Sequence, residues 1–124
     1  MPENQLLLLQ DAEAYVTDLL SNKLSKTIKF HTLRHTQEVV AACKLLADHQ
    51  QLSEDERLPL MLAAWFHDTG YTGGEAKGHE MLSIQLATDF LNARAASSEL
   101  IDKITGCINA TRMPQSPVTV IERI

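Results

Sequence analysis

Apolar residues recur with the period of an α-helix along almost the whole chain. No segment shows the alternation of apolar and polar residues that is typical of a strand. The pattern therefore predicts an all-α fold, a helical bundle of about five to six helices. The expected helices cover residues 3–24, 32–49, 58–67 and 79–95, followed by a fifth that is capped at residue 97 or 98 and the opening of a sixth at 118–124.

The third predicted helix, residues 58–67, is apolar nearly all round, so we expect it to lie at the centre of the fold. Ser53 and Glu56 have the spacing of a capping box ahead of it. Pro59 favours two pieces in this region, a short acidic turn and then the buried helix. The polar, glycine-rich segment 69–78 is expected to form a loop directly after the helix.

Length and charge narrow the class of protein. A chain of 124 residues can bury one core, so we expect a single domain spanning residues 1–124. It has 16 acidic and 11 basic residues and a formal net charge of −5. This balance argues against a nucleic-acid polymer as partner, because a phosphate backbone requires clustered Lys and Arg. A small phosphorylated substrate is still compatible, since a bound metal dominates the local field.

The sequence offers no candidate for a membrane span or a secretory signal. No apolar run approaches the roughly 20 residues that a membrane helix needs. The apolar run at 6–9 is short and is flanked by acidic residues. Cys43 and Cys107 lie within apolar helical patterns and outside any CxxC motif, so we expect reduced thiols in the core. These features predict a cytoplasmic protein without a membrane partner.

A histidine and an aspartate, His67 and Asp68, stand side by side at the end of the third predicted helix. Both are good ligands for divalent metals, but adjacent residues on a helix point about 100° apart, so they can share an ion only where the backbone leaves the helix. His35 is expected on the inward face of the second helix, beside Val39. A single inward His is more often a hydrogen-bonded core residue. Two of them with a buried carboxylate favour a metal, because burying Asp68 without a cation is costly. We therefore predict His35, His67 and Asp68 as metal ligands.

Four segments carry a resemblance to a known family: RHTQEVV (34–40), LAAWFHDTGY (62–71), GHEMLSIQLATDFL (78–91) and CINATRMP (107–114). They resemble the HD-domain superfamily of metal-dependent phosphohydrolases, in particular its bacterial members. The resemblance implies an HD-domain helical bundle in which His35, His67 and Asp68 bind the metal together with a distant C-terminal Asp. Nothing after Pro117 supplies that Asp, so we expect an HD-like domain that is truncated on its C-terminal side.

Members of this superfamily with two metals carry further His residues on the following helices. His79 matches the first of those positions, but residues 109–111 contain no His. We therefore expect no dinuclear site and assign His79 to the substrate side. Arg34, beside His35, and Lys77, in the loop before His79, are the basic side chains expected to bind a phosphate. Each is also compatible with a solvated surface charge.

The resemblance implies a metal-dependent phosphohydrolase, a phosphomonoesterase or phosphodiesterase that acts on a nucleotide or another small phosphate ester. Two imidazoles with one or two carboxylates suit Mn²⁺, Fe²⁺, Co²⁺ or Ni²⁺ better than Mg²⁺. Asp68 is the predicted catalytic residue, because it can orient the water that the metal activates. Two alternatives stay open: a noncatalytic metal- or ligand-binding regulatory domain and, with less support, a di-iron oxygenase of the same superfamily. The apolar helix start at 118–124 is compatible with a homo-oligomer.

Overall fold

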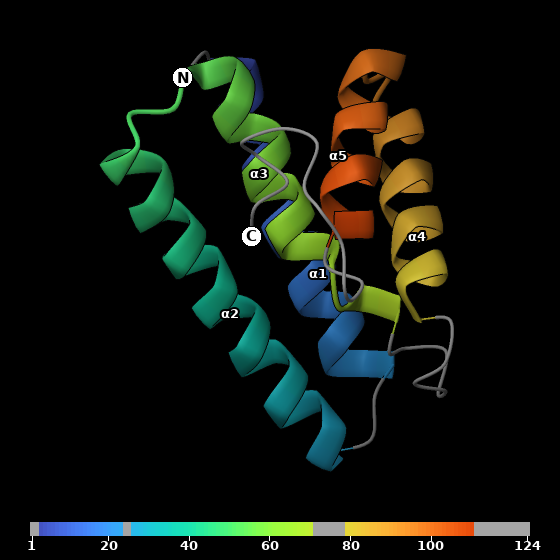
Figure 1. Ribbon diagram of the computed structural model, residues 1–124. Coiled ribbons are helices and arrows are strands. Elements are labelled where there is room, and N and C mark those ends of the chain that lie inside the picture. The colour runs from blue at the N-terminus through green and yellow to red at the C-terminus, as the bar shows by residue number, and fades with distance from the viewer. Residues whose placement is uncertain (1–2, 24–25, 71–78, 111–124) are drawn as a thin grey trace.

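The computed structural model describes residues 3–23, 26–70 and 79–110, with the backbone alone at 23, 26–32, 79–80 and 110; these residues contain five α-helices and no strand (Figure 1). The helices are α1 (Glu3–Lys23), α2 (Lys26–His49), α3 (Glu54–Phe66), α4 (His79–Ala93) and α5 (Ser98–Ala110). The predicted all-α class is confirmed, whereas the sixth helix predicted at 118–124 lies outside the described residues. None of the helices in this part of the chain is long and apolar enough to cross a membrane.

Two predicted helix boundaries are wrong. α2 begins at Lys26 rather than at Thr32, and the residues before and after Pro59 form one helix rather than a turn and a helix. Pro59 lacks an N–H and so removes one hydrogen bond to the carbonyl four residues earlier. That loss falls close to the first turn of α3, which the capping box of Ser53 and Glu56 already fixes. The helix therefore continues through Pro59, which is buried.

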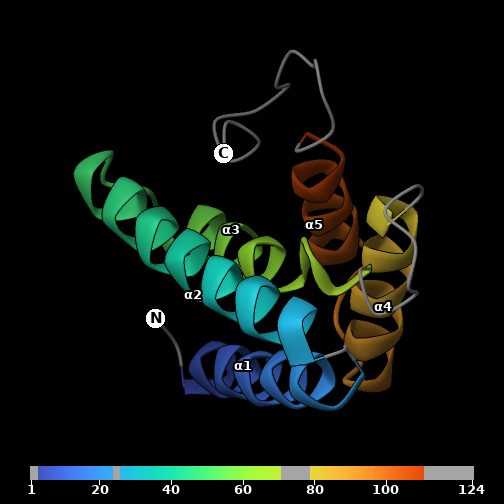
Figure 2. The same cartoon turned by 90° about the horizontal axis from the view of Figure 1, so that it is seen from below.

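The central place predicted for the third helix is confirmed. α3 contacts each of the other helices, and its residues 58–60 and 62–66 are buried. In Figure 1 it lies between α2 on one side and the pair α4 and α5 on the other. Figure 2, turned by 90°, shows α1 along a further side of the bundle. The C-terminal end of α3 is thus enclosed by other elements.

Three aromatic rings from α1, α3 and α4 meet near the C-terminal end of α3. The ring centroids of Tyr15 and Phe66 lie 5.9 Å apart, and that of Phe90 lies 5.2 Å from each of them. The rings are tilted against one another, as aromatic pairs prefer. Phe66, the last residue of α3, is fully buried among them. This cluster anchors the last residue of α3 in the core.

Both cysteines are thiols in the interior, as predicted. Cys43 lies on α2 and Cys107 on α5, and both are buried. Burial raises the pKa of the Cys43 thiol, because the thiolate would lose its hydration. A raised pKa lowers the thiolate fraction at neutral pH, so Cys43 has the character of an unreactive core residue.

Candidate metal centre

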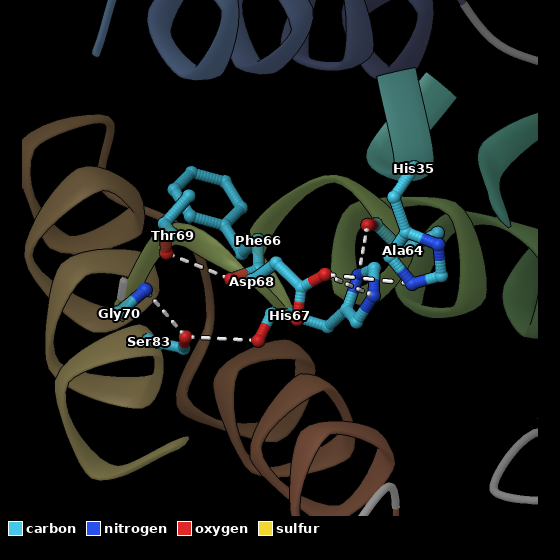
Figure 3. Close-up of polar contacts among 8 residues, drawn as sticks. All are labelled: His35, Ala64, Phe66, His67, Asp68, Thr69, Gly70 and Ser83. Atoms are coloured by element: carbon cyan, nitrogen blue, oxygen red, sulfur yellow. Dashed lines mark hydrogen bonds and ion pairs between the residues drawn. The ribbon is translucent and has the colours of Figure 1, made fainter. Parts of the chain in front are cut away.

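The ligands predicted from the sequence lie where α3 ends (Figure 3). His67 is the C-cap residue of α3 and keeps helical backbone angles, φ −59° and ψ −29°, while its N–H donates to the carbonyl of Ala63. Asp68 already lies in the turn that follows the helix. The backbone therefore leaves the helix between His67 and Asp68, which allows these adjacent side chains to point toward a common position.

Two buried hydroxyl groups hold this turn. The Thr69 hydroxyl donates to the carbonyl of Phe66 at 2.7 Å. The Ser83 hydroxyl, on α4, donates to the carbonyl of His67 at 2.9 Å and accepts from the N–H of Gly70 at 2.8 Å. Both side chains are fully buried. The bonds satisfy carbonyl groups that the end of a helix otherwise leaves without a partner.

Three side-chain donor atoms from α2 and the end of α3 meet beside the turn. Oδ2 of Asp68 lies 3.2 Å from Nε2 of His67 and 3.5 Å from Nε2 of His35. The three ligand atoms all lie within 4.8 Å of one another. Since metals bind nitrogen and oxygen at about 2.0–2.2 Å, neighbouring donors around one ion lie roughly 3–3.5 Å apart. The arrangement therefore fits a group that could hold a metal ion.

A backbone carbonyl fixes the orientation of the His67 ring. Its Nδ1 lies 2.7 Å from the carbonyl oxygen of Ala64. Because a carbonyl only accepts hydrogen bonds, Nδ1 carries the proton of the neutral ring and Nε2 carries the lone pair. Nε2 is also the atom that faces Asp68. A lone pair that faces a carboxylate oxygen requires a proton or a metal cation between them.

The pKa of His67 is raised above its ordinary value of 6.5. Burial lowers this pKa, but the hydrogen bond to Asp68, the charge of Asp68 and the carbonyl of Ala64 together raise it by more. Below this raised pKa, the metal-free protein carries a proton on Nε2 at the place where a metal would bind. Protons and metal ions therefore compete for this nitrogen.

The three ligand side chains differ in their access to solvent. The side chains of His67 and Asp68 are 12% and 13% exposed, whereas that of His35 is 57% exposed. The prediction that His35 points inward is therefore wrong. The neighbouring Thr36, which is fully buried, occupies the inward position of this turn of α2. The ligand group is consequently enclosed on the side of α3 and open to solvent at His35.

Of the predicted substrate-side residues, Arg34 is the one whose side chain lies within the described part of the chain. Arg34 lies on the exposed surface of α2, where its Nε donates to Oε1 of Glu38 at 3.1 Å. His79 is the first residue of α4, and its side chain lies outside the description. Lys77 lies outside the described residues altogether. Binding of substrate by Arg34, Lys77 and His79 stays a prediction.

The sequence pattern did not identify Ser83, because the apolar residues of α4 mark only part of its buried face. The apolar residues Leu82, Leu86 and Phe90 have helical spacing, but among the described side chains of α4 the buried ones are Ser83, Ala87, Phe90 and Leu91. Leu82 and Leu86 are half-buried. The spacing of four among Ser83, Ala87 and Leu91 is the signal that could have revealed this face.

Comparison with known proteins adds no relative, since no family model, curated protein or solved structure matches this chain. The structure itself shows an all-α domain with five helices in its described residues. It also shows that His35, His67 and Asp68 form a group that could hold a metal ion. Any narrower assignment depends on the chemistry of that group and on the sequence motifs.

Proposed function

We propose that this chain is a metal-dependent phosphohydrolase of the HD-domain type, which acts on a nucleotide or another small phosphate ester through a metal-activated water. The observation that carries the proposal is the convergence of His35, His67 and Asp68. His35 belongs to α2 and the other two follow α3, so the fold brings together residues that are far apart in the sequence. The same residues stand at the ligand positions of the motifs at 34–40 and 62–71 that resemble HD domains.

The donor set favours a borderline divalent metal. Two imidazole nitrogens and a carboxylate oxygen suit Mn²⁺, Fe²⁺, Co²⁺ or Ni²⁺ better than Mg²⁺. His67 is oriented for this role, because its Nδ1–H is bound by the Ala64 carbonyl and its Nε2 faces the other donors. A cation there would also offset the cost of enclosing the Asp68 carboxylate.

Each residue of the group has its own role in the proposed reaction. His67 and Asp68 would hold the ion on the enclosed side, and His35 would hold it on the side that is open to solvent. When bound there, a divalent metal lowers the pKa of water and offsets the negative charge of phosphoryl oxygens. Asp68 additionally accepts a hydrogen bond from the attacking water and orients it. The substrate-side residues predicted from the sequence are the candidates to bind the phosphate oxygens.

The test is a screen of phosphate monoesters, phosphate diesters and nucleotides with each candidate metal added to the metal-free protein. We expect hydrolysis with at least one of Mn²⁺, Fe²⁺, Co²⁺ and Ni²⁺. Asp68→Ala should reduce the rate by about 100-fold or more, because it removes both a ligand and the group that orients the water. Asp89→Ala is the matched control, since it removes a carboxylate from the exposed surface of α4, where Asp89 accepts from Gln85. It should retain the full rate.

Metal binding and catalysis are measured separately. Isothermal titration with Co²⁺ reports the ligand group, and phosphate or alcohol release reports the reaction. A chain that binds Co²⁺ but hydrolyses no ester would overturn the phosphohydrolase and favour a noncatalytic metal-binding domain. Substrate-dependent oxygen uptake with Fe²⁺ would instead favour an oxygenase. Unchanged activity in Asp68→Ala would overturn the proposed site.

A further inference from the structure

The buried hydroxyl of Ser83 binds the backbone on both sides of Asp68. It donates to the carbonyl of His67 at 2.9 Å and accepts from the N–H of Gly70 at 2.8 Å (Figure 3). The two partners lie 16 and 13 residues away in the sequence. These bonds therefore form only when α4 packs against the end of α3.

The carbonyl bound by Ser83 belongs to the peptide unit that joins His67 to Asp68. This unit is planar, so the direction of its carbonyl sets ψ of His67 and φ of Asp68 together. These two angles decide where the carboxylate of Asp68 points relative to the ring of His67. On a continued helix the two side chains would diverge by about 100°, whereas here Nε2 and Oδ2 lie 3.2 Å apart.

Two further hydrogen bonds of the turn act on a different peptide unit. The N–H of His67 donates to Ala63, and the carbonyl of Phe66 accepts from Thr69. Both groups belong to the peptide unit between Phe66 and His67. They anchor the last residue of the helix, while the bonds of Ser83 anchor the segment that carries Asp68.

We propose that Ser83 is a positioning residue of the metal site: by binding the His67 carbonyl and the Gly70 N–H, it sets the direction of the Asp68 carboxylate and thereby the affinity and coordination geometry of the bound metal. The inference rests on the proposed metal-dependent function. It gives α4 a part in the site, although the three donors come from α2 and the end of α3. Mutation of a residue that orients a metal ligand in this way typically lowers metal affinity by about 10–100-fold.

The test is a Co²⁺ titration of the full chain, followed by the visible absorption of the bound ion, which reports its coordination geometry. Ser83→Ala should weaken Co²⁺ binding by about 10-fold or more and shift the absorption bands at saturation. Ser83→Thr keeps the hydroxyl and should restore both. Circular dichroism identifies the temperatures at which each variant is folded, and the titrations are made there.

Ser97→Ala is the control for a purely structural effect. The Ser97 hydroxyl accepts from the N–H of Leu100 at the start of α5, which lies at the opposite end of the bundle from the end of α3 (Figure 1). Its removal should lower stability while leaving the Co²⁺ affinity and spectrum unchanged. If Ser83→Ala is folded and binds Co²⁺ with the affinity and spectrum of the wild type, the inference is overturned.

The outcomes separate this inference from the proposed function. A wild-type chain that binds Co²⁺ but hydrolyses no phosphate ester defeats the phosphohydrolase and leaves the role of Ser83 standing. A wild-type chain that binds no Co²⁺ defeats both proposals. Loss of affinity in Ser83→Ala that Ser83→Thr does not restore would assign the effect to the shape of the side chain and would also overturn the inference.

Discussion

The two ends of α3 are held in different ways. At the N-terminal end, the Ser53 hydroxyl accepts from the N–H of Glu56 at 3.3 Å, and the Glu56 carboxylate accepts from the N–H of Ser53 at 3.2 Å. These partners are three residues apart. At the C-terminal end, Ser83 binds His67 and Gly70 across 16 and 13 residues. The first end is therefore fixed by its own sequence, and the second is fixed by its packing against α4.

The two ends of α3 therefore differ in role: the first contributes to stability alone, and the second also holds the proposed ligands. The capping box at the start of α3 lies on the exposed surface and touches none of the proposed ligands. The hydrogen bonds at its end hold the segment that carries His67 and Asp68. Changes at the first end should lower stability alone, whereas changes at the second should alter both stability and metal binding.

The largest expected effect on stability comes from Phe66→Ala at the C-terminal end. Phe66 is fully buried, and its ring packs against Tyr15 and Phe90. Removing a buried aromatic ring typically costs about 3–5 kcal/mol. This is a large part of the free energy of unfolding of a small domain, which is roughly 5–15 kcal/mol. Urea unfolding measures this loss, and Phe66→Leu, which keeps an apolar side chain, should lose less. A loss of less than about 1 kcal/mol in Phe66→Ala would contradict the central position of this ring.

A second effect at the same end should depend on pH. The folded metal-free protein raises the pKa of His67 above 6.5, because the hydrogen bond and charge of Asp68 and the carbonyl of Ala64 outweigh burial. A raised pKa means that the protonated ring stabilises the fold below the unfolded pKa and that this contribution is lost as the pH rises through the folded value. Urea unfolding with a chelator present should therefore show that the wild type loses stability over this range relative to His67→Gln.

Added Co²⁺ should reverse this trend, because the metal binds the deprotonated ring. The stabilisation by a fixed concentration of Co²⁺ should increase as the pH rises through the folded pKa of His67. Ser53→Ala provides the comparison from the other end of α3. It should lower the free energy of unfolding by the same amount throughout this pH range. Equal pH dependence in wild type and His67→Gln would show that another group controls it.

A smaller and purely structural effect is expected from Ser53→Ala. The loss of an N-cap hydroxyl typically costs about 0.5–2 kcal/mol. The Ser53 hydroxyl accepts from the N–H of Glu56 and donates to the Glu56 carboxylate, and the alanine variant keeps only the bond from the backbone N–H of residue 53. Chemical unfolding measures the cost, and Ser53→Asp, which keeps an acceptor at the cap, should avoid most of it. The Co²⁺ affinity should stay unchanged. A weaker affinity in Ser53→Ala would show that the two ends of α3 are coupled.

The sequence predicted those features of the fold that depend on local spacing. The helical period gave an all-α fold with α3 at its centre, and the spacing of Ser53 and Glu56 gave the capping box that the structure contains. Chemistry and position at the helix end singled out His67 and Asp68, and the structure places their donor atoms together with that of His35. These signals lie within a few residues of one another, so the sequence displays them directly.

Features that depend on packing between helices could not be predicted in the same way. Ser83 and Ala87 of α4 are buried whereas Leu82 and Leu86 are half-buried, and the Ser83 hydroxyl reaches the backbone at the end of α3. The side chain of His35 is more exposed than expected, since the buried Thr36 holds the inward position beside it. Hydropathy ranks serine and threonine as surface residues, so it cannot identify a hydroxyl that is buried for its hydrogen bonds or its shape.

The smallest expected change in stability comes from Thr36→Val and distinguishes two buried hydroxyls. Thr36 and Ser83 are both fully buried, but Oγ1 of Thr36 has no hydrogen-bond partner within the described part of the chain, whereas Ser83 has two. Burying a hydroxyl without a partner costs about 1–3 kcal/mol in proteins. Thr36→Val replaces that hydroxyl by a methyl group of similar shape, so it should stabilise the fold by about 1 kcal/mol in urea unfolding. A clear loss of stability would show that the Thr36 hydroxyl has a partner, and the contrast between the two hydroxyls would then fail.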